Sequence, residues 1–418
     1  MIKTIQLDLE KESVRLLEWL GEFGKDPEGG ITRFLYSPEW TEAQKGLENL
    51  MKEEGFQVQY DEVGNLFGRL EGTRYTDESV LTGSHVDTVK NGGYYDGQFG
   101  IVAGILALKY LKETYGQPLR NLEVVSMAEE EGSRFPYTFW GSKNIVGTAK
   151  RSEVENIKDF NGCSFVEAMR EAGFAFRDES RELRKDIKAF IELHAEQGGV
   201  LEIEQTPIGI VQHIVGQRRF TIEVEGEANH AGTTPMGYRK DAMNAASRII
   251  SAINDIAIKY GDPLVATVGK VEVEPNIVNV VPGKVIFTID CRHTHKDKLV
   301  QATEEIQATM KKIADQTGVN LNIDLWMDAD PVPMDDRVVR VIQEQCEKNN
   351  LNYKLMHSGA GHDAQIMAEL APTAMLFVPS HKGISHSPLE FTEPKDLAAG
   401  VKALIGALYE LGYKEDLI

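Results

Sequence analysis

The sequence lacks the features that mark membrane proteins and nucleic-acid-binding proteins. No stretch approaches the ~18–20 consecutive apolar residues that a membrane-spanning helix needs. Basic residues are outnumbered 45 to 65 by acidic ones, which gives a formal net charge of −20. A charge of this sign repels phosphate backbones and anionic lipid. We therefore expect neither a nucleic acid nor a membrane as a partner, although a local basic pocket could still bind a small anionic substrate.

Cysteine is scarce as well. Cys163, Cys291 and Cys346 are odd in number and far apart in the sequence, which argues against a disulfide framework. Residues 1–10 contain no apolar segment of the length found in signal peptides. Both observations favour a cytoplasmic location.

Several common catalytic signatures are missing. The sequence contains no Gly-x-x-x-x-Gly-Lys-Ser/Thr loop, no Gly-x-Gly-x-x-Gly fingerprint and no Gly-x-Ser-x-Gly elbow. It also contains no His-Glu-x-x-His helix and no Cys-x-x-Cys pair. A P-loop, a dinucleotide fold, a serine hydrolase and the simplest zinc sites are therefore disfavoured.

The length of 418 residues exceeds what one hydrophobic core usually serves, so we expect two domains. Helix and strand signals alternate in the first half of the chain. Ile101, Ile105, Leu108 and Leu111 fall on one face of a helix predicted over 97–114. The other elements predicted in the first half of the chain are a helix over 37–54 and strands over 56–60, 66–70, 80–83 and 122–127. This pattern predicts an α/β fold with a mixed, mainly parallel sheet flanked by helices.

A different pattern begins near residue 208. Strands are predicted over 220–224, 265–273, 285–291 and 321–326, with helices over 241–259 and 296–316. The order strand–helix–strand–strand–helix–strand is that of a ferredoxin-like α+β unit. After Pro331 the α/β pattern returns, with a strand over 374–378 and a helix over 394–411. We predict a catalytic domain over 1–212 and 329–418, and an inserted domain over 213–328.

Histidines and carboxylates gather at the predicted strand ends. His85 follows an apolar run, and Asp87 lies two residues further on, where it could hold the second nitrogen of the imidazole. Asp96 lies in a glycine-rich loop just before a helix. His194 and His386 follow other strand-like runs. The His85–Asp87 pair could equally be an ordinary hydrogen bond, and a single histidine such as His194 or His386 is more often a hydrogen-bonded loop residue than a ligand.

Glu129, Glu130 and Glu131 end the strand over 122–127. Adjacent carboxylates repel one another, and nearby cations would relieve the repulsion; a solvated acidic loop is the plainer interpretation. Taken together, three histidines and several carboxylates suit two divalent cations that share a bridging carboxylate. Such a pair activates water and polarises a carbonyl, while one carboxylate stays unligated as the general base.

At this point the motifs resemble a known family. Those shared with the dinuclear metallopeptidase clan of aminoacylases and carboxypeptidase-like deacylases are Ser84-His85-Val86-Asp87-Thr88, Asp96-Gly97, Glu130-Glu131-Gly132 and Ser385-His386. His194, in His-Ala-Glu-Gln-Gly, is typical of the branch that holds N-carbamoyl-L-amino-acid hydrolases, β-ureidopropionases and allantoate amidohydrolases. Within it, Arg134–Phe135–Pro136, Val215-Gly216-Gln217-Arg218-Arg219 and His357-Ser358-Gly359-Ala360-Gly361-His362-Asp363 are most similar to the bacterial allantoate amidohydrolases.

The resemblance implies a role for each candidate residue. His85 and His194 would hold one metal ion, Glu131 and His386 the other, and Asp96 would bridge the two. Glu130 would be the general base, and Asp87 would orient His85. The remaining implied residues contact the substrate, and all except Gln197 lie in the inserted domain. Asn279 and Arg292 would bind the substrate carboxylate, Gln197 would bind the ureido group, and Gln217 would be a further substrate contact. His230, supplied by the partner subunit, would stabilise the oxyanion.

The implied activity is hydrolysis of allantoate to ureidoglycine, ammonia and carbon dioxide in purine degradation. Manganese is the implied metal, whereas the ligand types alone also admit zinc or cobalt. A homodimer through the inserted domain is implied as well. The alternatives are an N-carbamoyl-L-amino-acid hydrolase with the same metals and base, a metal-dependent sensor with an inactive site, and an aminopeptidase.

Overall fold

The computed structural model describes residues 7–180 and 182–417, and the chain forms two units, Met1–Gln212 with Met334–Ile418 and His213–Pro333. The second unit runs from His213 to Pro333. The inserted domain predicted from the sequence spans 213–328. Of the N-terminal residues considered for a signal peptide, 1–6 lie outside the described part. No helix within the described residues is long and apolar enough to cross a membrane.

The first unit is built on a mixed sheet whose central strands are parallel. The pairs β3–β4, β3–β5 and β5–β16 are parallel, and the pairs β1–β2, β2–β4, β6–β16 and β6–β14 are antiparallel. Among the described residues the order is β1-β2-β4-β3-β5-β16-β6-β14, with β15 paired to β6. This confirms the predicted mixed, mainly parallel sheet. The strands are β1 (Gln57–Tyr60), β2 (Leu66–Leu70), β3 (Tyr75–His85), β4 (Arg120–Met127), β5 (Ile187–Ala195), β6 (Ile208–Ile214), β14 (Val332–Pro333), β15 (Tyr353–Ser358) and β16 (Thr373–Val378).

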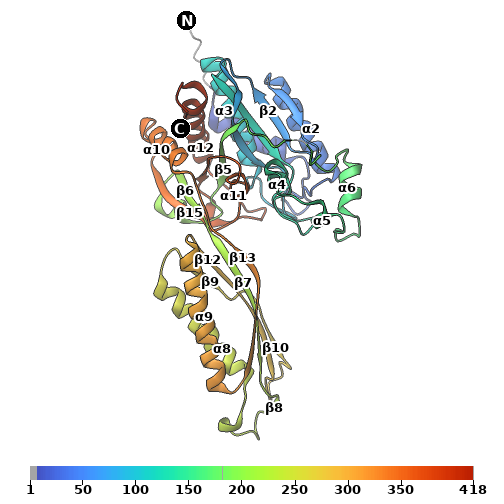
Figure 1. Cartoon of the computed structure of the whole chain (residues 1–418), viewed down its shortest axis with the longest axis vertical. Coiled ribbons are helices and arrows are strands. Elements are labelled where there is room, and N and C mark those ends of the chain that lie inside the picture. The colour runs from blue at the N-terminus through green and yellow to red at the C-terminus, as the bar shows by residue number, and fades with distance from the viewer. Residues whose placement is uncertain (1–6, 181, 418) are drawn as a thin grey trace. The chain divides into compact units, whose positions relative to one another are not determined.

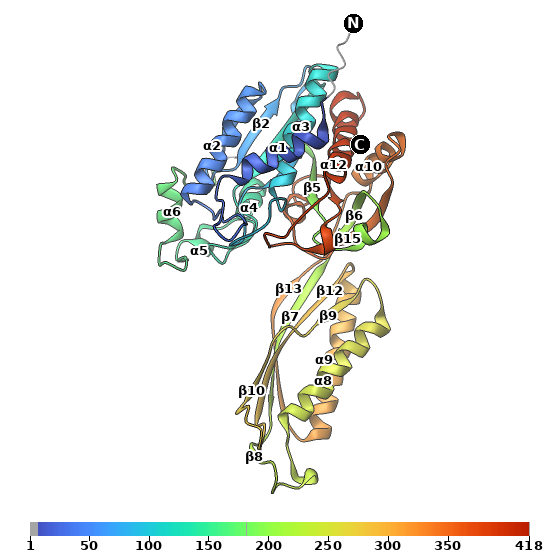
Figure 2. The same ribbon diagram turned by 180° about the vertical axis from the view of Figure 1, so that it is seen from behind.

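Helices cover both faces of this sheet (Figures 1 and 2). Leu193 of β5 faces Gly400 of α12, whereas its neighbour Glu192 accepts a hydrogen bond from the backbone of Ala364 in α11, so α12 and α11 lie on opposite faces. The helices are α1 (Leu9–Gly21), α2 (Pro38–Glu53), α3 (Gln98–Tyr115), α4 (Trp140–Val146), α5 (Arg151–Val154), α6 (Phe165–Glu171), α7 (Val200–Glu204), α10 (Asp336–Lys348), α11 (Asp363–Met367) and α12 (Pro394–Tyr413), with a 3₁₀ turn at His381–Gly383.

Two helices show how local sequence fixes the elements near the site. Ser37 caps α2, its side chain accepting a hydrogen bond from the backbone of Trp40, and Pro38 occupies the first turn, as predicted. Helix α3 differs from the one-faced helix that the sequence predicted, because every residue from Gln98 to Leu108 is buried. It packs between β3 and β4 on one side and α1 and α12 on the other, so it needs apolar residues all round.

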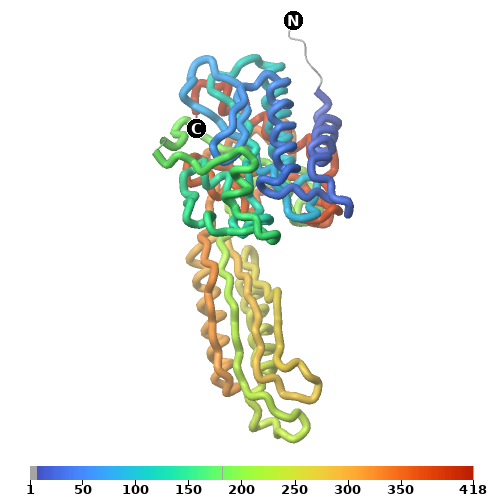
Figure 3. Tube along the Cα trace, turned by 90° about the vertical axis from the view of Figure 1, so that its right-hand side faces the viewer, coloured from blue at the N-terminus to red at the C-terminus, as the bar shows by residue number. Residues whose placement is uncertain are grey.

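The second unit has the predicted ferredoxin-like order. Its sheet runs β10-β12-β7-β13, and all neighbouring pairs are antiparallel. Figure 3 shows β7 in green beside β13 in orange. The elements are β7 (Gly216–Glu225), β8 (Asn229–His230), α8 (Ala242–Tyr260), β9 (Val265–Thr267), β10 (Val271–Glu274), β11 (Val280–Val281), β12 (Lys284–His293), α9 (Lys296–Thr317) and β13 (Asn320–Ala329), with a 3₁₀ turn at Met236–Tyr238.

The core of the second unit lies on one face of its sheet. Phe220, Ile222 and Val224 alternate along β7 and pack with apolar residues of α8 and α9. The single strand predicted over 265–273 is wrong. The chain forms two short strands there, β9 opposite residues 290–292 of β12 and β10 opposite residues 284–287. Gly269 lies in the break, where a residue without a side chain weakens strand pairing.

Candidate metal centre

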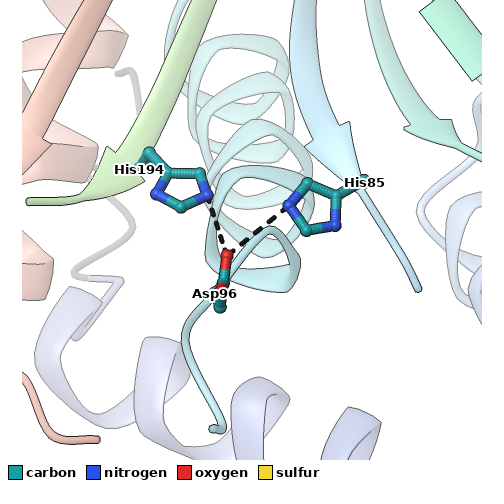
Figure 4. A group of neighbouring side chains, drawn as sticks. All are labelled: His85, Asp96 and His194. Carbon is teal, nitrogen blue, oxygen red and sulfur yellow. Dashed lines mark ion pairs between the residues drawn. The ribbon is translucent and has the colours of Figure 1, made fainter. Parts of the chain in front are cut away.

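The carboxyl ends of neighbouring parallel strands bring two histidines together. His85 is the last residue of β3, and His194 precedes the last residue of β5, which pairs with β3 in parallel. Asp96 lies in the loop just before α3, and its carboxylate points to both imidazoles (Figure 4). Asp96 Oδ1 lies 3.5 Å from Nε2 of His85 and 3.2 Å from Nε2 of His194. All three side chains are buried, so this group can hold a cation with little water.

The second oxygen of Asp96 faces a second group. Asp96 Oδ2 lies 3.1 Å from Nε2 of His386, and the same nitrogen lies 3.4 Å from Oε1 of Glu131. His386 comes from the loop after β16, and Glu131 from the loop after β4. The two groups therefore share one carboxylate, with one oxygen of Asp96 directed at each.

Each of the two buried histidines turns Nδ1 toward an oxygen and Nε2 toward Asp96. Nδ1 of His194 lies 2.9 Å from the carbonyl oxygen of Ala195, and Nε2 accepts a hydrogen bond from the backbone N–H of Gly97. The proton of His194 is therefore assigned to Nδ1. Nδ1 of His85 lies 3.2 Å from Oδ1 of Asp87 and 3.1 Å from its carbonyl oxygen. Both rings thus present Nε2 to Asp96 and hold Nδ1 against an oxygen, the arrangement of metal-ligating histidines.

Asp87 also fixes the turn that holds two glutamates. Its Oδ1 accepts a hydrogen bond of 3.0 Å from the backbone N–H of Glu130, and Oδ2 one of 3.2 Å from that of Glu131. Both glutamates can approach His85, and of the two Glu131 alone belongs with Asp96 and His386 to a ligand group among the described residues. This geometry favours Glu131 as the ligand that accompanies Asp96 and His386, although Glu130 also belongs to a possible ligand group with His85 and Glu131.

The buried charges fit cations. Burial and the nearby Asp96 raise the pKa of Glu131 to about 8, and burial raises the pKa of Glu130 well above its ordinary value, with further contributions from Glu131 and Asp363. Although burial opposes it, the close histidines His194, His386 and His85 hold the pKa of Asp96 well below its ordinary value. Divalent ions would offset this carboxylate repulsion.

Two orphaned oxygens support the same conclusion. Among the described residues, Oε2 of Glu129 and Oδ2 of Asp363 are buried without a hydrogen-bond partner. Burial raises the pKa of Asp363 to about 8. Unsatisfied buried carboxylate oxygens are costly, so their presence beside the ligand groups indicates a polar site that is completed by something other than protein. The donor set of imidazoles and carboxylates fits Mn, Zn or Co ions.

Gly97 gives the histidines their room. A Cβ atom at this position would lie 2.4 Å from Cε1 of His85, and the residue has a φ of 65°. Both the space and the backbone conformation therefore favour glycine between Asp96 and the start of α3.

Gln197 lies inside the cluster, in the left-handed conformation with a φ of 57°. Its amide nitrogen donates to Oδ2 of Asp96 and to Oγ of Ser385, both at 3.0 Å. The resemblance implied a contact with the ureido group of the substrate. The structure shows a contact with the shared carboxylate, so any substrate contact would be made by the same amide group.

The other implied residues belong to the second unit. His230 of β8 is exposed and pairs with Val280 of β11, one residue after Asn279. Arg292 of β12 lies opposite Gln217 of β7 in the sheet. Its Nε and Nη2 donate to the two oxygens of Asp290 at 2.9 and 2.8 Å. The structure thus groups His230 with Asn279 and Gln217 with Arg292.

Three buried acids around the centre were not predicted. Glu390 accepts hydrogen bonds from the backbone of Asp96, and Glu192 accepts from Ser84 and Ala364. Glu192 also forms a possible ligand group with His194 and His362. Asp363 accepts from Ser142. The sequence signal was weak: Glu192 lies two residues before His194 on the same strand face, whereas Glu390 reaches the centre only through folding of its loop.

The chain and its fold are those of a known enzyme class. Residues 81–410 match the model of peptidase family M20/M25/M40, and the chain belongs to this family. It is 56% identical to an allantoate amidohydrolase of Escherichia coli (96% of this chain, 97% of the relative) and 46% identical to one of Bacillus subtilis (98% and 99%). An N-carbamoyl-L-amino-acid amidohydrolase of Pseudomonas is 36% identical over 96% of this chain and 98% of its own.

A solved structure supports the same assignment. The crystal structure of a hydantoinase/carbamoylase-family amidase from Burkholderia multivorans matches with a TM-score of 0.90 at 33% identity, covering 96% of this chain and 97% of that one. The predicted family resemblance is therefore confirmed.

Proposed function

We propose that this protein hydrolyses allantoate to ureidoglycine, ammonia and carbon dioxide. The observation that supports this most is the pair of ligand groups on the two oxygens of Asp96, with Glu130 beside them. The substrate follows from the allantoate amidohydrolases of Escherichia coli and Bacillus subtilis, which are more similar to this chain than the N-carbamoyl-L-amino-acid amidohydrolase of Pseudomonas.

The metal assignment in this proposal is two divalent cations. His85 and His194 would hold one, Glu131 and His386 the other, and Asp96 both. When bound, such cations lower the pKa of water and polarise a carbonyl. We take manganese as the working ion from the family resemblance, with zinc and cobalt compatible with the same donors.

Glu130 would move the proton. In this scheme its carboxylate takes a proton from the attacking water and delivers it to the departing nitrogen, so that ammonia leaves. The carbamate that remains loses carbon dioxide. Asp87 would keep both His85 and the Glu130 backbone in place, because one carboxylate contacts both.

The second unit would bind the substrate. Arg292 and Asn279 would hold the carboxylate, for which the planar guanidinium is suited, and Gln217 lies opposite Arg292 on the neighbouring strand. Gln197 would contact the ureido group. His230 would stabilise the oxyanion and come from the partner of a homodimer formed through this unit in the cytoplasm.

A substrate comparison tests the proposal. Protein stripped of metal would be assayed for ammonia release from allantoate and from N-carbamoyl-L-methionine, with and without Mn²⁺. We expect manganese-dependent turnover of allantoate. Turnover of N-carbamoyl-L-methionine alone would replace the substrate but keep the reaction class, and silence with both would reject the proposed hydrolysis.

A further inference from the structure

A buried carboxylate ties together two loops that each supply the metal centre. Oε2 of Glu390 accepts hydrogen bonds from the backbone N–H groups of Tyr95, at 2.8 Å, and Asp96, at 3.1 Å. Oε1 of the same side chain accepts one from Oγ of Ser385, at 2.9 Å. Glu390 is 4% exposed. One side chain therefore contacts the loop of Asp96 and the residue that precedes His386.

The loop of His386 needs such a contact. The imidazole of His386 is 51% exposed, whereas those of His85 and His194 are 2% and 0% exposed. His386 also has a φ of 53°, a conformation that costs free energy for a residue other than glycine. Neither burial nor a regular strand holds this ligand, so its position depends on the contacts of its neighbours.

Ser385 joins the same network from the other side. Its hydroxyl accepts from the amide nitrogen of Gln197 at 3.0 Å, and Gln197 also donates to Oδ2 of Asp96. Ser385 Oγ lies 3.4 Å from the same Asp96 oxygen. Oδ2 is the oxygen that faces His386. The network therefore ends at the ligand group of Glu131 and His386, away from the buried group of His85 and His194.

We propose that Glu390 is a positioning residue, which fixes the Asp96 loop to the His386 loop and thereby sets the affinity of the Glu131–His386 group for its cation. The inference rests on the proposed metal-dependent function. Outer contacts of this kind typically change metal affinity or activity by about 10–100-fold when they are removed. Glu390 need not touch the substrate or the reacting atoms for this role.

The variants Glu390→Ala and Glu390→Gln separate geometry from charge. Glutamine can accept the two backbone N–H groups with its amide oxygen and donate to Ser385 with its amide nitrogen, so it keeps the contacts and loses the charge. Alanine loses both. The cavity of about 420 Å³ that Glu390 lines, beside α1, Tyr94 and Tyr95, can admit water to the freed N–H groups. Alanine should therefore loosen the loops without unfolding the protein.

Metal binding to the purified full chain is the direct test. Mn²⁺ affinity and stoichiometry would be measured by calorimetry and by competition with a chelator, together with thermal unfolding of the stripped protein. We expect Glu390→Ala to weaken one Mn²⁺ site by about 10–100-fold and leave the other unchanged. Glu390→Gln should stay within about 3-fold of the parent, a difference of a fraction of one hydrogen bond. Glu393→Ala, which removes an exposed acid three residues away, is the matched control.

Each outcome decides the inference. Unchanged Mn²⁺ binding in Glu390→Ala would overturn it, and so would equal losses in the alanine and glutamine variants, because charge alone would then explain the effect. If Glu390→Ala does not fold, Ser385→Ala removes one arm of the contact, and unchanged binding there would count against the role. Metal affinity is measured without substrate. A parent protein that binds Mn²⁺ but does not hydrolyse allantoate would therefore reject only the proposed substrate, and the role of Glu390 could still be tested.

Discussion

The two ligand groups that share Asp96 are built in different ways. His85 and His194 lie at the ends of paired parallel strands and are buried. Glu131 and His386 lie on loops, and the His386 side chain is half exposed. The first group is positioned by the sheet itself, whereas the second depends on hydrogen bonds between loops. We call these two groups half-sites: the His85–His194 half-site and the Glu131–His386 half-site, which share Asp96. The comparison indicates that one carboxylate can join a half-site held by the sheet to one held by loops, and we expect the two to bind metal with different affinities.

The largest expected effect distinguishes the base from both ligand groups. Glu130→Gln should lower kcat by about 100- to 10,000-fold, the range for loss of a general acid–base group, while the Mn²⁺ content stays at the parent level. Ammonia release and metal analysis would check this. Glu131→Gln is the paired variant and should lose metal. If Glu130→Gln instead loses metal and Glu131→Gln does not, the roles of the two residues are exchanged.

The next effect tests the inequality of the half-sites directly. His386→Ala should weaken Mn²⁺ binding at the Glu131–His386 half-site by at least about 100-fold, because loss of a direct ligand should exceed the 10–100-fold effect of losing an outer contact. Mn²⁺ binding at the His85–His194 half-site should be unchanged, because the sheet holds those ligands independently of the His386 loop. His194→Ala should weaken the buried site and disturb the shared Asp96. Equal loss of both ions in both variants would show that the half-sites are not independent.

A smaller effect is expected in the second unit. Arg292→Ala should lower kcat/KM for allantoate by roughly 30-fold, corresponding to about 2 kcal/mol for a lost charge-assisted contact, with normal metal content. Arg219→Ala is the control, because Arg219 contacts the same Asp290 but was not assigned to the substrate. Parent-like kinetics in Arg292→Ala would reject its role in holding the carboxylate.

The smallest expected effect is the release of protons when Mn²⁺ binds. The pKa of Glu131 is raised to about 8, by burial and Asp96, and that of His386 to about 9, by its hydrogen bond to Asp96. Below these values both groups hold protons that a cation must displace. Mn²⁺ affinity should therefore rise as the pH rises from 7 toward 9, with protons released on binding at pH 7. Calorimetry in buffers of different ionisation enthalpy measures the release, and a pH-independent affinity would contradict it.

The sequence predicted the strand-borne half-site better than the loop-borne one. His85 and His194 follow apolar runs, and parallel strands place their carboxyl ends at one edge of a sheet, so the pattern is compatible with their proximity, while their pairing came from the family resemblance. His386 was also singled out after a strand-like run, but its pairing with Glu131 came from the family resemblance, because no local pattern specifies where a loop returns. Glu390 was missed for the same reason: its contacts with Tyr95 and Asp96 join segments about three hundred residues apart.

The fold was predicted to a similar extent. The alternating apolar residues of β7 and the helix predicted over 241–259 agree with the layout of the second unit, in which Asp241 caps α8. The break between β9 and β10 was missed, since Gly269 lies in a run of residues that otherwise favours one strand. The all-round burial of α3 was missed because it depends on helices that pack against it from distant parts of the chain.

Gly97 has a practical consequence for anyone who wishes to change what this protein accepts. A side chain there would collide with the imidazole of His85, so a mutant library that varies the loop before α3 would be filled with inactive members. Positions on β7 and β12 near Gln217 and Arg292 are better choices for mutagenesis, because the two strands pair through their backbones and do not depend on a particular side chain there. The same glycine can be used to sort relatives: a chain with a bulkier residue at this position is not expected to keep the arrangement of His85, Asp96 and His194.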